Sequence, residues 1–165
     1  MPTKPQDIVV ALKACLGARE SYAALGQQLG MSASEIHSAF RRLRTARLLD
    51  VDGNVIRKRL REFLVHGVPY AYPAAPGELT RGTRTAWAVP KFASDAADED
   101  ARPVWPDPDG DTRGQAVEPL YPSVPKAVRQ DAALYDLLAA VDLLRIGRAR
   151  ERKLGEDFLN ERLAG

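Results

Sequence analysis

The sequence predicts a mainly α-helical fold with a small β-element, and three patterns carry this prediction. Apolar residues recur every three to four positions in several segments, as in amphipathic helices that pack on a core. Serine, asparagine and glycine stand where such segments begin and end. An Asp52-Gly53 turn lies between short apolar runs and predicts a hairpin. With 165 residues, 45% of them apolar, the chain is long enough for one core with an extension.

Four helices are predicted in the first half of the chain, over residues 7–16, 22–29, 33–48 and 54–66. Their expected N-terminal caps are Asp7, Ser21, either Ser32 or Ser34, and Asn54. Glu35 stands three residues after Ser32 and would complete a capping box. Gly17, Gly30 and Gly67 mark where the first, second and fourth helices end.

Short β-structure is expected at two places. Residues 49–55 alternate apolar and polar around the Asp-Gly turn, which favours a small hairpin, or wing, or one strand with a cap. Residues 70–72 and 85–89 are strand-like runs separated by a loop containing proline and glycine. These two runs predict a two-stranded ribbon that completes a first unit over residues 1–92.

The remainder is predicted to be an acidic linker over 93–116 and a helical extension over 117–165. The linker is rich in aspartate and proline, a composition that buries little apolar surface. Residues 117–125 carry too many prolines for a helix and are expected to lie extended, anchored by Leu120, Tyr121 and Val124. Two helices follow to about residue 163, and the first bears an apolar stripe of Leu134, Leu137, Leu138, Val141 and Leu144.

Charge is distributed unevenly along the chain. The formal net charge is only +2, yet residues 41–61 form a basic block and residues 95–111 an acidic one. Cys15 is the single cysteine, so no disulfide framework is expected. No apolar run reaches the roughly 20 residues of a membrane span, and the N-terminus has no leader pattern. These features predict a cytoplasmic protein with no membrane partner.

The helix pair over 22–48 has the properties needed to read double-stranded DNA. Its two helices are joined by the short turn Gly30-Met31-Ser32, and a major groove admits one helix while a preceding helix braces it. The alternative is a solvated helix in an ordinary bundle. The residues expected to contact DNA are Tyr22, Ser32, Ser34, His37, Ser38, Arg41, Arg42, Arg44, Arg57, Lys58, Arg81 and Arg84. For Arg81 and Arg84 the expected setting is a loop, either wing-like and DNA-bound or merely exposed.

Residues 22–32, continuing to Leu49, resemble the helix-turn-helix of MarR-like winged-helix regulators of bacteria. This resemblance covers about the first 65 residues and implies a three-helix core with a β-wing. Residues 63–70 and 79–85 are similar to a group of MarR-like proteins from which no mechanism follows. The expected fold class is therefore mainly α with a small β-wing: an N-terminal winged helix-turn-helix plus a C-terminal helical extension.

The function predicted from these observations is sequence-specific DNA binding by a transcriptional regulator, with helix 33–48 in the major groove. A homodimer is expected through the apolar stripe, although the stripe could instead pack inward against Tyr70, Tyr72 and Trp87. The alternative function is an antitoxin or defence-system adaptor whose C-terminal part binds a partner protein; a winged helix used only for protein contacts is a third. No catalytic motif is present, so no enzyme activity, metal or cofactor is expected.

Overall fold

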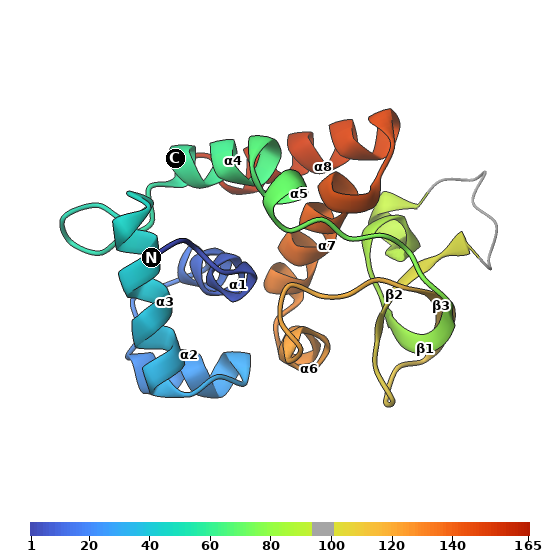
Figure 1. Cartoon of the computed structure of the whole chain (residues 1–165), viewed down its shortest axis with the longest axis horizontal. Helices are drawn as coiled ribbons and strands as arrows, with labels where there is room; N and C mark the ends of the chain where they lie inside the picture. The colour runs from blue at the N-terminus through green and yellow to red at the C-terminus, as the bar shows by residue number, and fades with distance from the viewer. Residues whose placement is uncertain (94–100) are drawn as a thin grey trace.

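The computed structural model describes residues 1–93 and 101–165, and it is mainly helical with a small three-stranded mixed sheet. In Figure 1, α1, α2 and α3 lie on one side, the sheet lies on the other, and α7 stands between them. The α-helices are α1 (Pro5–Ala14), α2 (Tyr22–Leu29), α3 (Ala33–Thr45), α4 (Arg57–His66), α5 (Val68–Ala71), α6 (Val124–Ala127), α7 (Ala132–Ile146) and α8 (Ala149–Arg162). The strands are β1 (Leu79–Arg84), β2 (Pro103–Pro106) and β3 (Thr112–Ala116).

Helix α2 has the predicted bounds because its caps act as expected. The Ser21 hydroxyl accepts a hydrogen bond from the Ala24 amide at 3.1 Å, and Gly30 ends the helix in the left-handed conformation, with φ of 70°. The Ser32 hydroxyl caps α3 by accepting from the Glu35 amide at 3.0 Å. Both helix starts in this pair follow from short-range chemistry.

Helix α3 ends at Thr45 rather than Leu48, because a Schellman motif closes it early. The Arg47 amide donates to the Arg44 carbonyl and the Leu48 amide to the Leu43 carbonyl, each at 3.0 Å. Arg47 takes the left-handed conformation that this motif requires, with φ of 62°. Glycine usually occupies that position, so an arginine there gives no stop signal in the sequence.

Two other helix starts differ from prediction. Helix α1 begins at Pro5 with Lys4 as the N-cap residue, and Asp7 lies in its first turn. The buried Asp7 carboxylate accepts from the Lys4 backbone N–H at 2.8 Å, as in a capping box, and also from Arg42. Asn54 does not cap α4, which begins at Arg57. The backbone N–H of Asn54 donates to Asp50 Oδ1 at 2.9 Å, and this bond closes the turn between Leu49 and Val55. That turn is the predicted hairpin, reduced to one antiparallel bridge.

The predicted ribbon from 70–72 and 85–89 is wrong. Residues 68–71 form helix α5, which starts with Pro69 in its first turn, where proline is tolerated. Residues 86–88 form a 3-10 helix, η1 (Ala86–Ala88), in which Ala86 has a φ of 49° that no strand adopts. The strand β1 lies in the segment predicted to be a loop, because its pairing partners come from distant parts of the sequence.

The described part of the predicted acidic linker is not a linker. Strands β2 and β3 lie within it, and each of the three strands pairs with the other two. Strand β1 is antiparallel to both, with Thr83 opposite Trp105 and Thr80 opposite Gly114, while β2 and β3 are parallel. Trp105 is only 1% exposed. This one large aromatic side chain buries apolar surface that the mostly polar composition of the segment did not lead us to expect. Residues 94–100 of the predicted linker lie outside the described residues.

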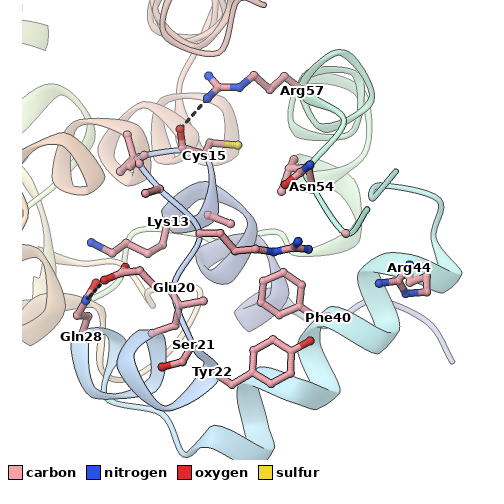
Figure 2. A pocket seen from close by; sticks show the side chains of 18 residues that line it. Lys13, Cys15, Glu20, Ser21, Tyr22, Gln28, Phe40, Arg44, Asn54 and Arg57 are labelled. Carbon is pink, nitrogen blue, oxygen red and sulfur yellow. Dashed lines mark hydrogen bonds between the residues drawn. The ribbon is translucent and has the colours of Figure 1, made fainter. Parts of the chain in front are cut away.

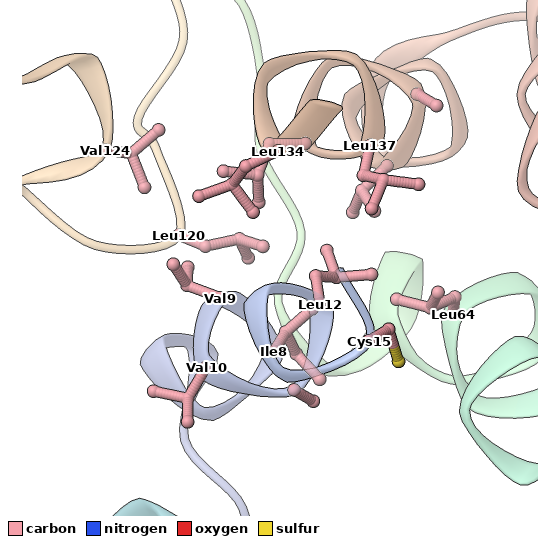
Figure 3. Packing of buried hydrophobic residues seen from close by; sticks show 14 of the residues in the cluster. Ile8, Val9, Val10, Leu12, Cys15, Leu64, Leu120, Val124, Leu134 and Leu137 are labelled. Atoms are coloured by element: carbon pink, nitrogen blue, oxygen red, sulfur yellow. The ribbon is translucent and has the colours of Figure 1, made fainter. Parts of the chain in front are cut away.

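Helix α7 is the centre of the core. Its predicted apolar stripe is buried within the chain, and the helix packs against α1, α5, α8 and η1. Figure 3 shows Leu134 and Leu137 of α7 facing Leu12 and Val9 of α1, with Leu120 beside them. The stripe therefore packs inward, as in the alternative, against α8, η1, α5 and α1. Tyr70, one of the three expected partners, is instead exposed. The stripe on which the expected dimer depended is not exposed.

The segment before α6 ties the two halves together, but the predicted extended run over 117–125 is only partly right. Residues 120–123 bend and turn, and Val124 and Pro125 begin helix α6, whose first turn tolerates proline. Leu120 and Val124 are buried anchors. The Tyr121 hydroxyl donates to Glu35 Oε2 at 2.9 Å, and the Ser123 hydroxyl donates to the Leu29 carbonyl at 2.5 Å. Residues 117–123, called the strap below, thus hold the end of α2 and the start of α3.

Candidate nucleic-acid interface

The turn between α2 and α3 is tight and fixes the two helices against each other. A Cβ atom built on Gly26 would collide with the Met31 carbonyl oxygen, so only glycine permits this approach. Met31 is itself buried, and its amide donates to the Gly26 carbonyl at 2.8 Å. The orientation of α3 relative to α2 is therefore set by a short turn with little freedom.

Helix α3 has one buried face and one polar face. Ile36, Ala39 and Leu43 are fully buried and recur at helical spacing. The opposite side, called the α3 polar face below, consists of Ser34, His37, Ser38, Arg41, Arg44 and Thr45, of which only Ser38 is half-buried. In the part of the chain that the structure describes, neither Arg41 nor Arg44 forms a salt bridge. These cations are free to meet an external anion.

The one acidic residue of α3 is kept away from this face by the strap. Glu35 accepts the hydrogen bond from Tyr121, and this bond, aided by burial, raises the pKa of the Tyr121 hydroxyl. The predicted capping box is thus half formed, since the Glu35 side chain turns to Tyr121. The α3 polar face carries no carboxylate of its own helix.

Tyr22 joins α2 to α3 through aromatic contacts. Its ring stacks on Phe40 with 5.2 Å between centroids and an interplanar angle of 23°, and it lies 5.7 Å from the His37 ring. Such packing restricts the rotation of His37 on the α3 polar face. The structure therefore brings together most of the predicted contact residues of α2 and α3.

Arg42 is an exception, and its predicted role as a DNA contact is wrong. It is 6% exposed, and its Nε and Nη2 donate to the two oxygens of Asp7, each at 2.8 Å. The hydrogen bond to Asp7 raises the pKa of Arg42 against the opposing effect of burial. Arg42 lies on the edge of the buried face and joins α3 to α1. The basic block in the sequence does not distinguish this structural arginine from its exposed neighbours.

Cations from other elements flank the hairpin after α3. Lys58 and Arg59 are exposed on α4, and Arg59 donates to the Arg47 carbonyl at 2.9 Å. Arg57 is half-buried and donates to the Cys15 carbonyl at 2.7 Å. At the turn, backbone hydrogen bonds led by that from Asn54 lower the pKa of Asp50. Arg19 and Arg47 also belong to this basic surface. Arg47 lies in the basic block noted in the sequence but was not among the expected DNA contacts, and Arg19 lies outside that block and was missed.

Arg81 and Arg84 are not in a loop near α3. They lie on β1, at the end of the molecule opposite α2 and α3 (Figure 1). Arg81 is exposed and faces Arg113 across the β1–β3 pair, whereas Arg84 is half-buried and its Nε has no hydrogen-bond partner. The structure therefore separates these two residues from the α3 polar face.

An open cleft of about 950 Å³, called the cationic cleft below, lies beside α3. Figure 2 shows it between the end of α1, the start of α2, α3 and the hairpin, with Phe40 pointing into it. Its charged lining residues are Lys13, Arg19, Glu20, Arg44 and Arg57. Arg44 thus belongs to both the α3 polar face and the cleft. Burial raises the pKa of the Cys15 thiol at its edge, with Arg57 opposing the shift, so Cys15 stays protonated at neutral pH.

Two other kinds of site, a metal centre and a membrane span, are absent from the described residues. Within residues 1–93 and 101–165, no three histidine, cysteine, aspartate or glutamate side chains gather in a way that could hold a metal ion. Over the same residues, no helix is both long enough and apolar enough to cross a membrane.

Comparison with known proteins identifies no relative of this chain. No protein-family model matches the chain, no curated protein matches its sequence, and no solved structure matches its fold. The function of the chain is therefore inferred from its own geometry and charge.

Proposed function

We propose that this chain binds double-stranded DNA in a sequence-specific manner and acts as a transcriptional regulator in the cytoplasm. The observation that carries the proposal is the α3 polar face, which is exposed, free of carboxylates from its own helix and held by a tight turn against α2. Short polar side chains near the start of such a helix suit contacts with base edges, and arginines further along suit phosphates or guanine.

In this proposal α1, α2 and α3 form the three-helix core of a winged helix-turn-helix, and the hairpin over 49–55 is its wing. Val51 at the hairpin tip is 94% exposed, as expected of a residue that meets a groove rather than the core. The flanking cations Arg47, Lys58 and Arg59 would contact the phosphate backbone, which supplies most of the salt-dependent affinity. The helices after the strap are the C-terminal extension.

Regulation by partner-protein binding, as in an antitoxin or adaptor, is the second candidate, and no observation favours it over DNA binding. The apolar stripe of α7 that could have received a partner is buried within the chain. A homodimer stays a prediction. The reason to expect one is that a dimer contacts two half-sites on the DNA, which raises its affinity. Its interface would lie away from this stripe.

The decisive experiment is selection of duplexes from a random DNA library by the full chain, followed by titration of the selected duplex. We expect a recurring sequence, and we expect Arg41→Ala to weaken binding by about 1–3 kcal/mol if it reads a base. The matched control is Arg150→Ala, which removes an exposed arginine from α8. Failure to enrich any sequence, or equal affinity of the two variants, would show that α3 does not read DNA.

A further inference from the structure

The cationic cleft holds more positive charge than the protein neutralises. Arg19, Arg44 and Arg57 line it, and none of them forms a salt bridge within the described ranges 1–93 and 101–165. Lys13 is already paired with Asp131 at 2.6 Å, and Glu20, the one acid of the lining, accepts from Gln28 at 2.8 Å. Like charges that gather without counter-charges destabilise a fold unless an anion joins them.

Two of these guanidinium groups are held in place by backbone carbonyls. Arg57 Nη2 donates to the Cys15 carbonyl at 2.7 Å, and Arg19 Nη2 donates to the Asp52 carbonyl. A guanidinium has five N–H donors, so each group keeps donors for a ligand after making this one bond. The side chains are thereby positioned before any ligand arrives, which lowers the entropic cost of binding.

Gly53 allows the cations from α3 and the loop after α1 to meet at the hairpin. A Cβ atom on Gly53 would collide with Arg19 Nη2 and would lie 3.5 Å from Arg44 Nη2. Gly53 also has a φ of 84°, which L side chains rarely adopt. The conformation of this turn therefore depends on glycine, and a side chain here would also displace the end of Arg19 from its place beside the hairpin.

Aromatic rings form the apolar part of the cleft. Phe40 and Tyr22 both line it and stack on each other, and Figure 2 shows both rings on the α2–α3 side of the cleft, away from Arg57. Arginines and rings in one cleft offer both an electrostatic and a stacking contact. The volume of about 950 Å³ is at the upper end of the range for small-molecule sites.

We propose that the cationic cleft binds a multiply charged organic anion that carries an aromatic ring, the chemical class to which nucleotides belong. Arg19, Arg44 and Arg57 stand against Glu20 of the lining and Asp50 at the hairpin, whose pKa Arg19 helps to lower. The cleft therefore keeps an excess of positive charge, with Arg44 and Arg57 the cations that a phosphorylated ligand would neutralise. The phosphates meet Arg19, Arg44 and Arg57, through charge-assisted hydrogen bonds. The ring lies against Phe40 and Tyr22.

Binding at the cleft has a consequence for DNA that rests on the proposed function. Arg44 belongs to both surfaces, so a ligand that engages its guanidinium competes with a duplex for the same donor. Each partner then weakens the other by the same factor, as linkage requires. The ligand would act as a signal that releases the protein from its site.

The test is calorimetric titration of the full chain with ADP, with adenosine and inorganic pyrophosphate as the two halves of the probe. We expect ADP to bind more tightly than either half. Arg19→Ala should weaken ADP binding roughly tenfold or more, as loss of a charge-assisted hydrogen bond does. Arg150→Ala, on α8, should leave it unchanged. No ADP binding at millimolar concentration, pyrophosphate binding as tightly as ADP, or equal affinity of the two variants would overturn the proposal.

This titration contains no DNA, so its result is independent of the proposed function. ADP binding by a chain that enriches no duplex would support the cleft as a ligand site and remove its link to DNA. A chain that selects a duplex but binds no ADP would retain DNA binding and lose the ligand site.

Discussion

The α2–α3 pair and the three-stranded sheet are similar in size but are built from contacts of opposite range. In the helix pair, Ser21, Gly30 and Ser32 each act on residues three or four positions away. In the sheet, β1 pairs with residues 20 or more positions later, and its end is fixed by Asp142, 57 positions from Thr85. Local chemistry sets the first region, and burial against distant segments sets the second.

The largest expected effect is on the sheet, through Trp105→Ala. The indole is buried, and its Nε1 donates to Asp142 Oδ2 at 2.7 Å. Removing it should cost about 3–5 kcal/mol in the free energy of unfolding, measured by denaturant titration. Pro106→Ala, at an exposed neighbour on the same strand, is the control and should cost far less. Equal effects would mean that the sheet is not supported from its buried side.

A comparably large effect is expected where the helix pair depends on a distant partner, Asp7. Asp7→Asn leaves the buried Arg42 guanidinium without its counter-charge, at a cost of about 3–5 kcal/mol in unfolding free energy. The control is Asp136→Asn, which breaks a more exposed pair with Lys91 and should cost under about 1 kcal/mol. A small loss of unfolding free energy for Asp7→Asn would show that local contacts alone stabilise the α2–α3 region.

A smaller effect is expected from the local contacts themselves. Ser32→Ala removes the side-chain cap of α3 and should lower the free energy of unfolding by about 0.5–2 kcal/mol. Ser38→Ala, within the same helix, is the matched control and should change stability little. If Ser32→Ala proved as damaging as Trp105→Ala, the contrast between the two regions would fail.

The smallest effect is a pH dependence at the edge of the sheet. Burial raises the pKa of Asp107, but hydrogen bonds from Arg129, Thr83 and the Asp109 amide outweigh it, and the pKa lies below its usual value. Asp107 therefore stabilises the fold above the unfolded pKa, near 4, and this contribution is lost as pH falls through the lower folded value.

Unfolding at pH 7 and at successively lower pH should show this loss. The difference in unfolding free energy between the native chain and Asp107→Asn should shrink as the solution is acidified below about pH 4. Asp109→Asn, at a side chain that is 83% exposed, should give no such trend. A difference that stays constant with pH would assign the effect of Asp107 to packing rather than to charge.

The same contrast explains which parts of the fold could be predicted. The bounds of α2, the cap of α3 and the existence of the α7 stripe follow from spacing and cap residues, which act over one or two turns. What covers the stripe did not follow, since a dimer was expected and packing within the chain is observed. The strand β1 could not be predicted, because Leu79–Arg84 has weak strand propensity and is extended only by its partners. The segment 70–72 shows the reverse, since Tyr70 and Ala71 are helical after Pro69 although the run had been predicted as a strand.

Prediction of the candidate site succeeded and failed for the same physical reasons. Ser34, His37, Arg41 and Arg44 share a face by helical geometry alone, so the α3 polar face was accessible from sequence. Arg42 was misassigned because its burial depends on Asp7, 35 positions earlier. The place of Arg19 in the cationic cleft could not be predicted from the sequence, since its side chain reaches Gly53 only because of how the hairpin folds back.

The packing of α1 on α7 bears on the order in which the chain can fold as it is made. Lys13 and its partner Asp131 are separated by 118 positions, so at ribosomal speeds of about 5–20 residues per second the first helix waits roughly 6–24 s for its cover. Until then, the apolar side chains of Ile8, Val9 and Leu12 have only the neighbouring helices to shield them. The newly made N-terminal half therefore exposes part of the apolar face of α1 until α7 emerges, so the core is completed only near the end of synthesis.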